Sequence, residues 1–166
     1  PVILVSALAA NLQLIASLIE NWLGHATFLG GFSNGQPISG LAYWIHSTPI
    51  LQEMITGGFR WVYALQAIGH LTFYIGFSIL FAYFWMKTSN QDAASQAKNI
   101  IHSGLSIPGF RKDARILESI LNRYITPLTI MGGAAIGLLA SAADLLGALV
   151  GGTAILLAVM ILYQLY

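Results

Sequence analysis

Apolar residues gather in four long runs, near positions 1–23, 61–86, 124–146 and 149–166, with polar segments between them. At about 1.5 Å per helical residue, the first three runs reach about 33–39 Å, which spans a hydrocarbon core of about 30 Å. The fourth run reaches only about 27 Å. None of the runs alternates between apolar and polar side chains over about ten residues, as the strands of a membrane barrel do. The pattern therefore predicts an all-α, multi-pass membrane helix bundle with four transmembrane helices.

The composition narrows the class of protein. Apolar residues make up 57% of the chain and charged residues only 8%, whereas soluble domains carry about 25% charged residues. This excludes a disordered chain, a collagen-like chain and a water-soluble enzyme. The absence of cysteine excludes disulfides and thiolate metal sites. The chain starts at Pro1 rather than methionine, so we expect a fragment of one membrane domain from a longer protein.

The distribution of charge predicts the orientation in the membrane. Six of the seven lysines and arginines lie in 87–123, and only Arg60 lies in 24–60. Because positive residues are retained on the cytoplasmic side, we expect 87–123 to be cytoplasmic and 24–60 to be extracellular. The net charge of +1 gives no reason to expect DNA as a partner.

The cytoplasmic segment has the pattern of a helical hairpin. A helix is predicted over 90–103 and a second one over 113–123, ahead of the third apolar run. Pro108-Gly109 between them favours a chain reversal, with Phe110 and Arg111 at its tip. Arginine at such a tip could bind a phosphate-rich partner, but on charge alone the positive-inside rule and attraction to anionic lipid are the better explanation.

Polar residues inside the apolar runs are the candidates for chemistry. Asn11 and Gln13 lie near the middle of the first run, where they could hydrogen-bond to other helices or line and gate a polar path. Asp144 is the only acid in the third run and lies near its outer end, so we expect it to pair with a neighbouring helix.

The sequence gives no sign of an enzyme or a metal site. It has no pair of carboxylates at mid-membrane and no nucleophile beside a base. The four histidines fall in different segments without the spacing of metal ligands. We therefore expect no catalytic residue, metal or cofactor.

Four motifs give the chain a family resemblance. The stretch from Pro1 to Leu14, PVILVSALAANLQL, resembles the seventh transmembrane helix of the archaeal SecY family. The stretch from Ser103 to Arg111, SGLSIPGFR, is similar to the cytoplasmic loop between helices eight and nine of that family. Arg123–Thr129 and Gly147–Thr153 resemble its ninth helix and the start of its tenth. The resemblance runs in order along essentially the whole chain.

The resemblance implies a function. SecY forms the channel of the Sec translocon, which conducts unfolded polypeptides across the membrane and releases hydrophobic segments sideways through a lateral gate. The chain would be the C-terminal half, helices seven to ten. Its implied partners are the N-terminal half of SecY, SecE, the small beta subunit, the ribosome, signal peptides, nascent chains and membrane lipid. The implied location is the cell membrane.

The resemblance also assigns roles to residues. Ile3 matches a position of the apolar pore ring, and so does Leu157, with Leu156 as an adjacent alternative. Asn11, with Gln13 beside it, matches the polar position at the lateral gate.

The loop arginine that the family uses to engage the ribosome or a motor matches Arg111. Phe110, Lys112 and Arg115 complete that partner-binding loop. The alternative function, a fragment of a small-solute secondary transporter, predicts mid-membrane charges or broken helices, which the sequence lacks.

Overall fold

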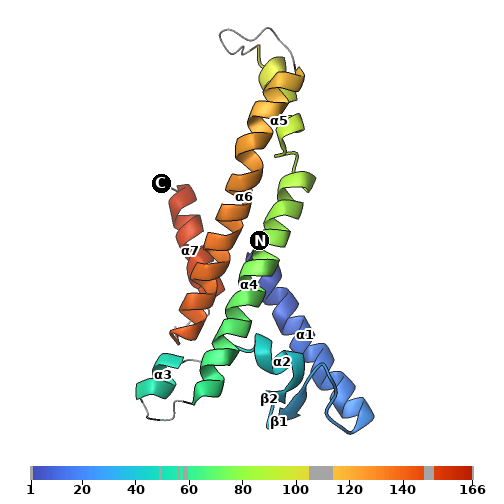
Figure 1. Ribbon diagram of the computed structural model, residues 1–166, viewed down its shortest axis with the longest axis vertical. Coiled ribbons are helices and arrows are strands. Elements are labelled where there is room, and N and C mark those ends of the chain that lie inside the picture. Colours follow the sequence, from blue (N-terminus) through green and yellow to red (C-terminus); the bar gives the residue numbers. More distant parts are fainter. Residues whose placement is uncertain are drawn as a thin grey trace.

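Two long helices lying side by side form the axis of the molecule (Figure 1). The computed structural model describes residues 2–48, 50–55, 57, 60–104, 114–147 and 152–165, with the side chains of 51–53 excepted. The elements are α1 (Val2–Leu23), β1 (Gly31–Ser33), β2 (Gln36–Ser39), α2 (Gly40–Ile45), α3 (Ile50–Ile55), α4 (Trp61–Thr88), α5 (Ala93–His102), α6 (Ala114–Leu145) and α7 (Gly152–Leu165). The mostly helical architecture confirms the predicted fold class.

Several helices have the length that a membrane requires. Val2–Leu23, Trp61–His102 and Ala114–Leu145 are long and apolar enough to cross a bilayer, and Gly152–Leu165 is a shorter apolar helix. Each of these helices overlaps one of the four apolar runs of the sequence. Which of their residues lie within the bilayer remains a prediction.

The third apolar run belongs to a longer helix than its pattern indicated. The sequence predicted a separate helix ending at Arg123, but α6 continues from Ala114 to Leu145 with Pro127 inside it. Proline removes one backbone hydrogen bond, and the local polar side chains pair within the same turns. Thr129 Oγ1 donates to the Ile125 carbonyl at 2.8 Å, and Thr126 Oγ1 donates to Asn122 Oδ1 at 2.9 Å. Packing against α4 and α5 along its length keeps α6 one element.

The segment between the first two runs contains a β-hairpin and two short helices within the residues that the structure describes. Strands β1 and β2 form an antiparallel hairpin whose turn, Asn34-Gly35, has positive φ at both residues. Two-residue turns of this kind match the twist of the strands. The Phe32 amide donates to Glu20 Oε2 at 2.7 Å, which ties the hairpin to α1. Helix α2 follows, and its buried Ala42 and Ile45 face the rest of the molecule.

The two polar segments lie at opposite ends of the long helices. The hairpin, α2 and α3 gather at one end, while α5 and the start of α6 lie at the other (Figure 1). Which of these two ends is extracellular and which is cytoplasmic stays a prediction. The tip residues Phe110, Arg111 and Lys112 fall outside the described residues.

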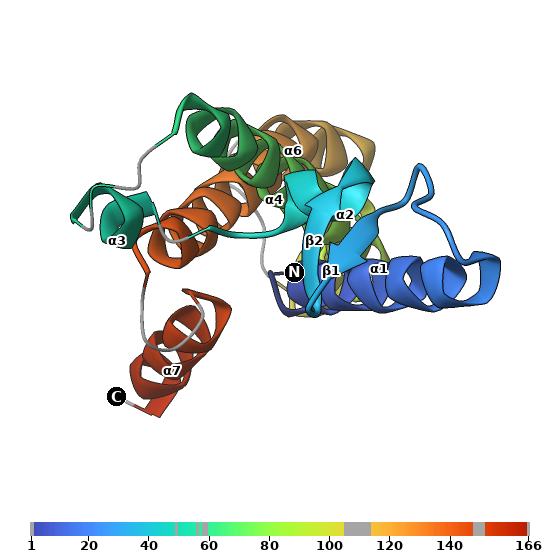
Figure 2. The same ribbon diagram turned by 90° about the horizontal axis from the view of Figure 1, so that it is seen from below.

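The core lies where α4 crosses α6. Gly137 brings the two backbones together, since a Cβ at this position would lie 2.8 Å from the Tyr74 carbonyl oxygen and 3.0 Å from Ile75 Cα. Small residues at such crossings are typical of membrane helices. Viewed from below, α1 and α7 lie on the same side of the α4–α6 pair (Figure 2). Val2 and Val5 of α1 pack with Tyr74 and Ala140 in the central cluster.

Candidate functional site

An open cavity of about 660 Å³ lies among α1, α4, α6 and α7. Its wall contains Ile3 of α1 and Leu157 of α7, the two residues that the sequence assigned to the pore ring. The other lining residues are Ser6, Ser47, Tyr74, Asp144, Thr153, Ala154, Ala158 and Ile161. Residues from opposite ends of the chain thus share one surface.

The orientation of α7 distinguishes the two leucines that the sequence left open. Thr153, Leu157 and Ile161 follow one another at four-residue spacing, so they share a helix face, and all three line the cavity. Leu156, one position earlier, packs against the core cluster instead. The geometry therefore favours Leu157 for contact with the contents of the cavity.

Ile3 faces the cavity because its neighbours on α1, Val2 and Val5, are packed into the core. Val2 and Val5 are buried in the core, whereas the Ile3 side chain is 53% exposed. Ser6 also lines the cavity, and its hydroxyl donates to the Ile3 carbonyl at 3.0 Å. The exposed Ile3 side chain thus lies beside the Ser6 hydroxyl, which already donates its hydrogen bond to the backbone.

A polar stripe on α4, which the sequence analysis missed, meets this cavity at Tyr74. Gln66, His70, Tyr74 and Ser78 recur every four residues and are all buried. Gln66 accepts from Thr48 Oγ1 at 2.8 Å and donates to the carbonyls of Tyr43, at 2.8 Å, and His46, at 3.2 Å. The four-residue spacing of polar side chains within an apolar run was the available signal.

Within this polar region, the buried His70 faces Asp144 of α6, whose side chain is 12% exposed. His70 Nδ1 lies 2.6 Å from the Ile45 carbonyl oxygen, and its Nε2 lies 3.8 Å from Asp144 Oδ2. The latter distance exceeds a hydrogen bond, and Nε2 is buried without a hydrogen-bond partner. Asp144 Oδ1 accepts a hydrogen bond from the Gly152 amide at the start of α7. The predicted pairing of Asp144 with a neighbouring helix is therefore confirmed.

The outer segment adds a second histidine near this region. His46 follows α2, and its backbone amide donates to the Ala42 carbonyl at 3.0 Å. Burial lowers the pKa of the His46 imidazole, and the nearby His70 lowers it further. A neutral His46 is therefore favoured in the folded protein.

Asn11 and Gln13 do not share a surface. Asn11 is exposed and its Nδ2 donates to the Ala7 carbonyl of the same helix at 2.8 Å. Gln13 lines a different cavity, of about 810 Å³, with Ser17, Glu20 and residues of the β-hairpin. The separation follows from helix geometry, because side chains two positions apart point in different directions. The structure gives neither amide a hydrogen bond to another helix within the described residues.

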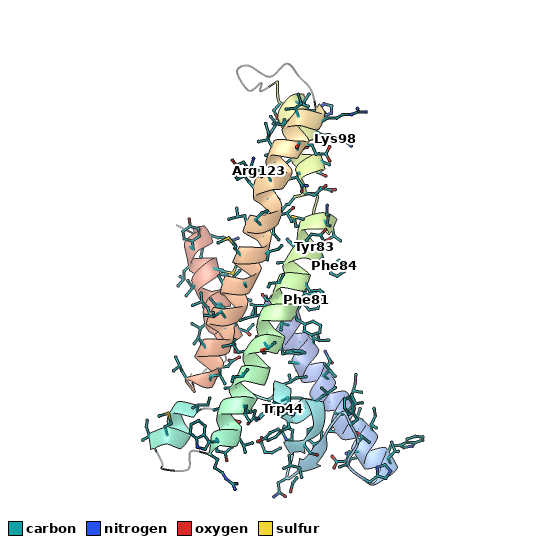
Figure 3. All side chains as sticks on the ribbon, viewed as in Figure 1. Trp44, Phe81, Tyr83, Phe84, Lys98 and Arg123 are labelled. Carbon is teal, nitrogen blue, oxygen red and sulfur yellow. The ribbon has the colours of Figure 1, made fainter. Side chains whose placement is uncertain are left out.

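Basic residues of the predicted partner-binding loop are only partly described. Arg115 is exposed in the first turn of α6. Lys98 of α5 and Arg123 of α6 lie at the same end of the molecule, far from Trp44 of α2 (Figure 3). Phe110, Arg111 and Lys112 are not among the described residues. Among the side chains that are described, no group of three or more histidines or acids could hold a metal ion.

Apolar helices of membrane-spanning length, arranged around an open cavity with branched apolar side chains, are the architecture of a membrane channel subunit. Comparison with known proteins identifies the family to which this channel subunit belongs. A family model described as SecY matches residues 1–166, so the chain belongs to the SecY family.

Individual relatives agree with this assignment. The chain is 43% identical over 166 residues to the protein translocase subunits SecY of Methanococcus vannielii and Methanothermobacter thermautotrophicus. All of this chain is covered, but only 36% and 35% of those relatives. The chain thus spans about a third of the length of the curated relatives it matches. Their name describes a translocase subunit rather than an enzyme, and it does not favour a solute transporter.

Solved structures show the same fold. One concerns the plug domain of SecY and the closed state of the translocation channel, and another is described as a protein conducting channel. Each matches with a TM-score of 0.76 and 36% sequence identity, over 99% of this chain and 36% of the other. The likeness covers the described helices but leaves most of each channel unmatched.

Proposed function

We propose that this chain forms one wall of the pore of a Sec translocon, which conducts unfolded polypeptides across the membrane and releases hydrophobic segments through a lateral gate. The shared cavity of Ile3 and Leu157 carries this proposal. The opposite wall belongs to the N-terminal half of SecY, because the chain spans only about a third of its relatives.

Ile3 and Leu157 contribute to an apolar ring that seals the pore at rest. Branched apolar side chains around a narrow passage exclude water and thereby block ions. They make no directional bonds, so they yield to a passing chain of any sequence. Such a ring fits a conduit for many different polypeptides.

Asn11 belongs to the lateral gate on α1, whereas Gln13, which the resemblance also placed there, lies on a different surface of the helix beside the β-hairpin. An exposed amide at mid-membrane is costly when it faces lipid. It is tolerated where another helix or water meets it, and the first half of the channel supplies that surface. A polar residue at this contact weakens a dry closed gate and eases its opening for signal peptides.

The partners follow from the same family assignment. SecE and the small beta subunit complete the complex in the cell membrane, with 87–123 cytoplasmic and 24–60 extracellular. The ribosome engages the loop with Phe110, Arg111, Lys112 and Arg115, and nascent chains enter from that side. Exposed Arg115 and Arg123 at this end of the molecule support a basic docking surface.

Polar substitutions in the ring test the proposed function. Ile3→Asn and Leu157→Asn in the full-length protein should raise the ion leak of the resting channel and admit weaker signal sequences, because an amide attracts water into the seal. Conductance in planar bilayers and translocation of graded signal sequences measure these effects. Leu4→Asn is the matched control, since Leu4 is 48% exposed but does not line the cavity. An unchanged leak together with unchanged selectivity contradicts the role in the ring.

Reversing the charge of Arg111 tests whether the cytoplasmic loop binds the ribosome. Arg111→Glu in the full-length protein should weaken ribosome binding, because it places a negative charge against ribosomal phosphates, while membrane insertion stays normal. Binding of ribosomes to reconstituted channels measures the affinity. Lys98→Glu, an equal charge change on α5, is the control. Wild-type affinity in the Arg111→Glu protein would count against this role.

A further inference from the structure

The start of α7 is held to α6 by one carboxylate and by close backbone contact. Asp144 Oδ1, near the end of α6, accepts the hydrogen bond of the Gly152 amide. An acceptor at this place satisfies one of the amides that a helix start leaves unpaired. A Cβ on Gly152 would collide with the Ala140 carbonyl oxygen, so the two backbones touch here.

This anchor lies close to the residue that faces the cavity. Leu157 comes five residues after Gly152, which is about 7.5 Å along a helix. Successive residues differ by about 100° around the helix axis, so a rotation of α7 by about that angle would exchange Leu157 for Leu156. The contacts that hold the first turn of α7 therefore determine whether Leu157 or Leu156 lines the cavity.

The other oxygen of Asp144 faces His70. Because the Ile45 carbonyl can only accept, His70 Nδ1 carries the proton that is shared at 2.6 Å. In the neutral ring Nε2 is then unprotonated, and it faces Asp144 Oδ2 at 3.8 Å without donating to it. Within the described residues Asp144 therefore makes its hydrogen bond through Oδ1 to the start of α7, and an uncharged acceptor oxygen at the same place could also make it.

From these contacts we propose that Asp144 is a positioning residue for the pore ring, because it fixes the rotation of α7 and so directs Leu157 into the cavity. The inference rests on the proposed function for the role of Leu157. It assigns to Asp144 no contact with the translocating polypeptide.

The test compares the accessibility of the two leucine positions. The chain has no cysteine, so Leu157→Cys and Leu156→Cys can be placed one at a time in a cysteine-free full-length protein. A water-soluble maleimide should label position 157 faster than position 156. Asp144→Ala should reduce this rate ratio about five- to tenfold, the size expected for the loss of a helix cap.

Two further variants keep the test decisive. Asp144→Asn should retain the ratio, because its Oδ1 still accepts from Gly152 and its Nδ2 can donate to His70 Nε2. Asp144→Glu keeps the charge but displaces the acceptor by one methylene, so it should lower the ratio even if Asp144→Ala fails to fold. An unchanged ratio in Asp144→Ala or Asp144→Glu overturns the proposal. A loss in Asp144→Asn as large as in Asp144→Ala also overturns it, since the charge would then be responsible.

Failure of the proposed function would give a different experimental result from failure of the role of Asp144. If Leu157 does not seal a pore, Leu157→Asn leaves the ion leak unchanged while the labelling ratio still responds to Asp144. If Asp144 does not position α7, the ratio persists in Asp144→Ala whatever the leak does.

Discussion

At the residue scale, Gly137 decides how closely α4 and α6 approach. Its backbone lies against Tyr74, Ile75 and Ser78, and a Cβ there would be 2.8–3.0 Å from their atoms. Gly132, on the same helix, has no atom within 4 Å of the corresponding point. The sequence showed a cluster of small residues in this run, but it could not tell which of them touches a neighbour.

The two glycines predict opposite effects on stability. Gly137→Ala should destabilise the full-length protein by about 1–3 kcal/mol, because overpacking forces the helices apart. Gly132→Ala is the matched control and should be neutral or stabilising by up to about 1 kcal/mol, because alanine favours the helix. Thermal unfolding in detergent measures both. Equal unfolding temperatures for the two variants would show that the crossing is looser than described.

At the element scale, the outer segment depends on one side chain of α4. Gln66 is only 2% exposed and pairs with Thr48 and with the carbonyls of Tyr43 and His46. It thereby fastens the end of α2 and the chain beyond it to the long helix. Pro127 and the Asn34-Gly35 turn belong to the same scale. Proline and glycine mark places where a helix or strand can end, and the chain does turn at Asn34-Gly35. At Pro127 it does not, because packing against α4 and α5 keeps α6 continuous.

Removing this fastening should release the outer segment. Gln66→Leu leaves two partly buried carbonyls and a partly buried hydroxyl without this partner, and a group left unsatisfied in a buried place costs about 1–3 kcal/mol. Hydrogen exchange at residues 40–48 in the full-length protein should accelerate roughly tenfold or more. Leu65→Ala, at the neighbouring exposed position, is the control and should leave exchange in this segment unchanged. Wild-type protection in Gln66→Leu would show that other contacts suffice.

At the scale of the whole molecule, the described helices bury few of their large apolar side chains and leave many of them exposed. Ile3 and many other large apolar side chains are exposed, including Phe84 and Tyr83 of α4, whose places Figure 3 shows. Such surfaces need lipid or further protein to cover them. The cavity of Ile3 and Leu157 is open for the same reason, since the four helices wall it incompletely.

This incompleteness predicts that residues 1–166 alone do not translocate protein. Reconstituted in liposomes, the chain should give background transport of a secretory substrate, because it supplies one wall of the passage. Adding all of the remaining part of SecY, with SecE and the small beta subunit, should restore transport. Activity of the isolated chain equal to that of the intact channel would contradict the proposed division of the pore.

The sequence by itself determined the class of protein, the runs that form the long helices, the family motifs and the candidates Ile3, Leu157, Asn11 and Arg111. The helices could be predicted because burial in lipid demands long uninterrupted apolar stretches, whereas the roles of Ile3, Leu157 and Arg111 are what the family resemblance implies. Only the tertiary structure decided that Leu157 rather than Leu156 lines the cavity, that Asn11 and Gln13 lie on different surfaces, and that Asp144 holds α7. These outcomes depend on the rotation of each helix against its neighbours, which packing between distant residues sets and no local pattern contains.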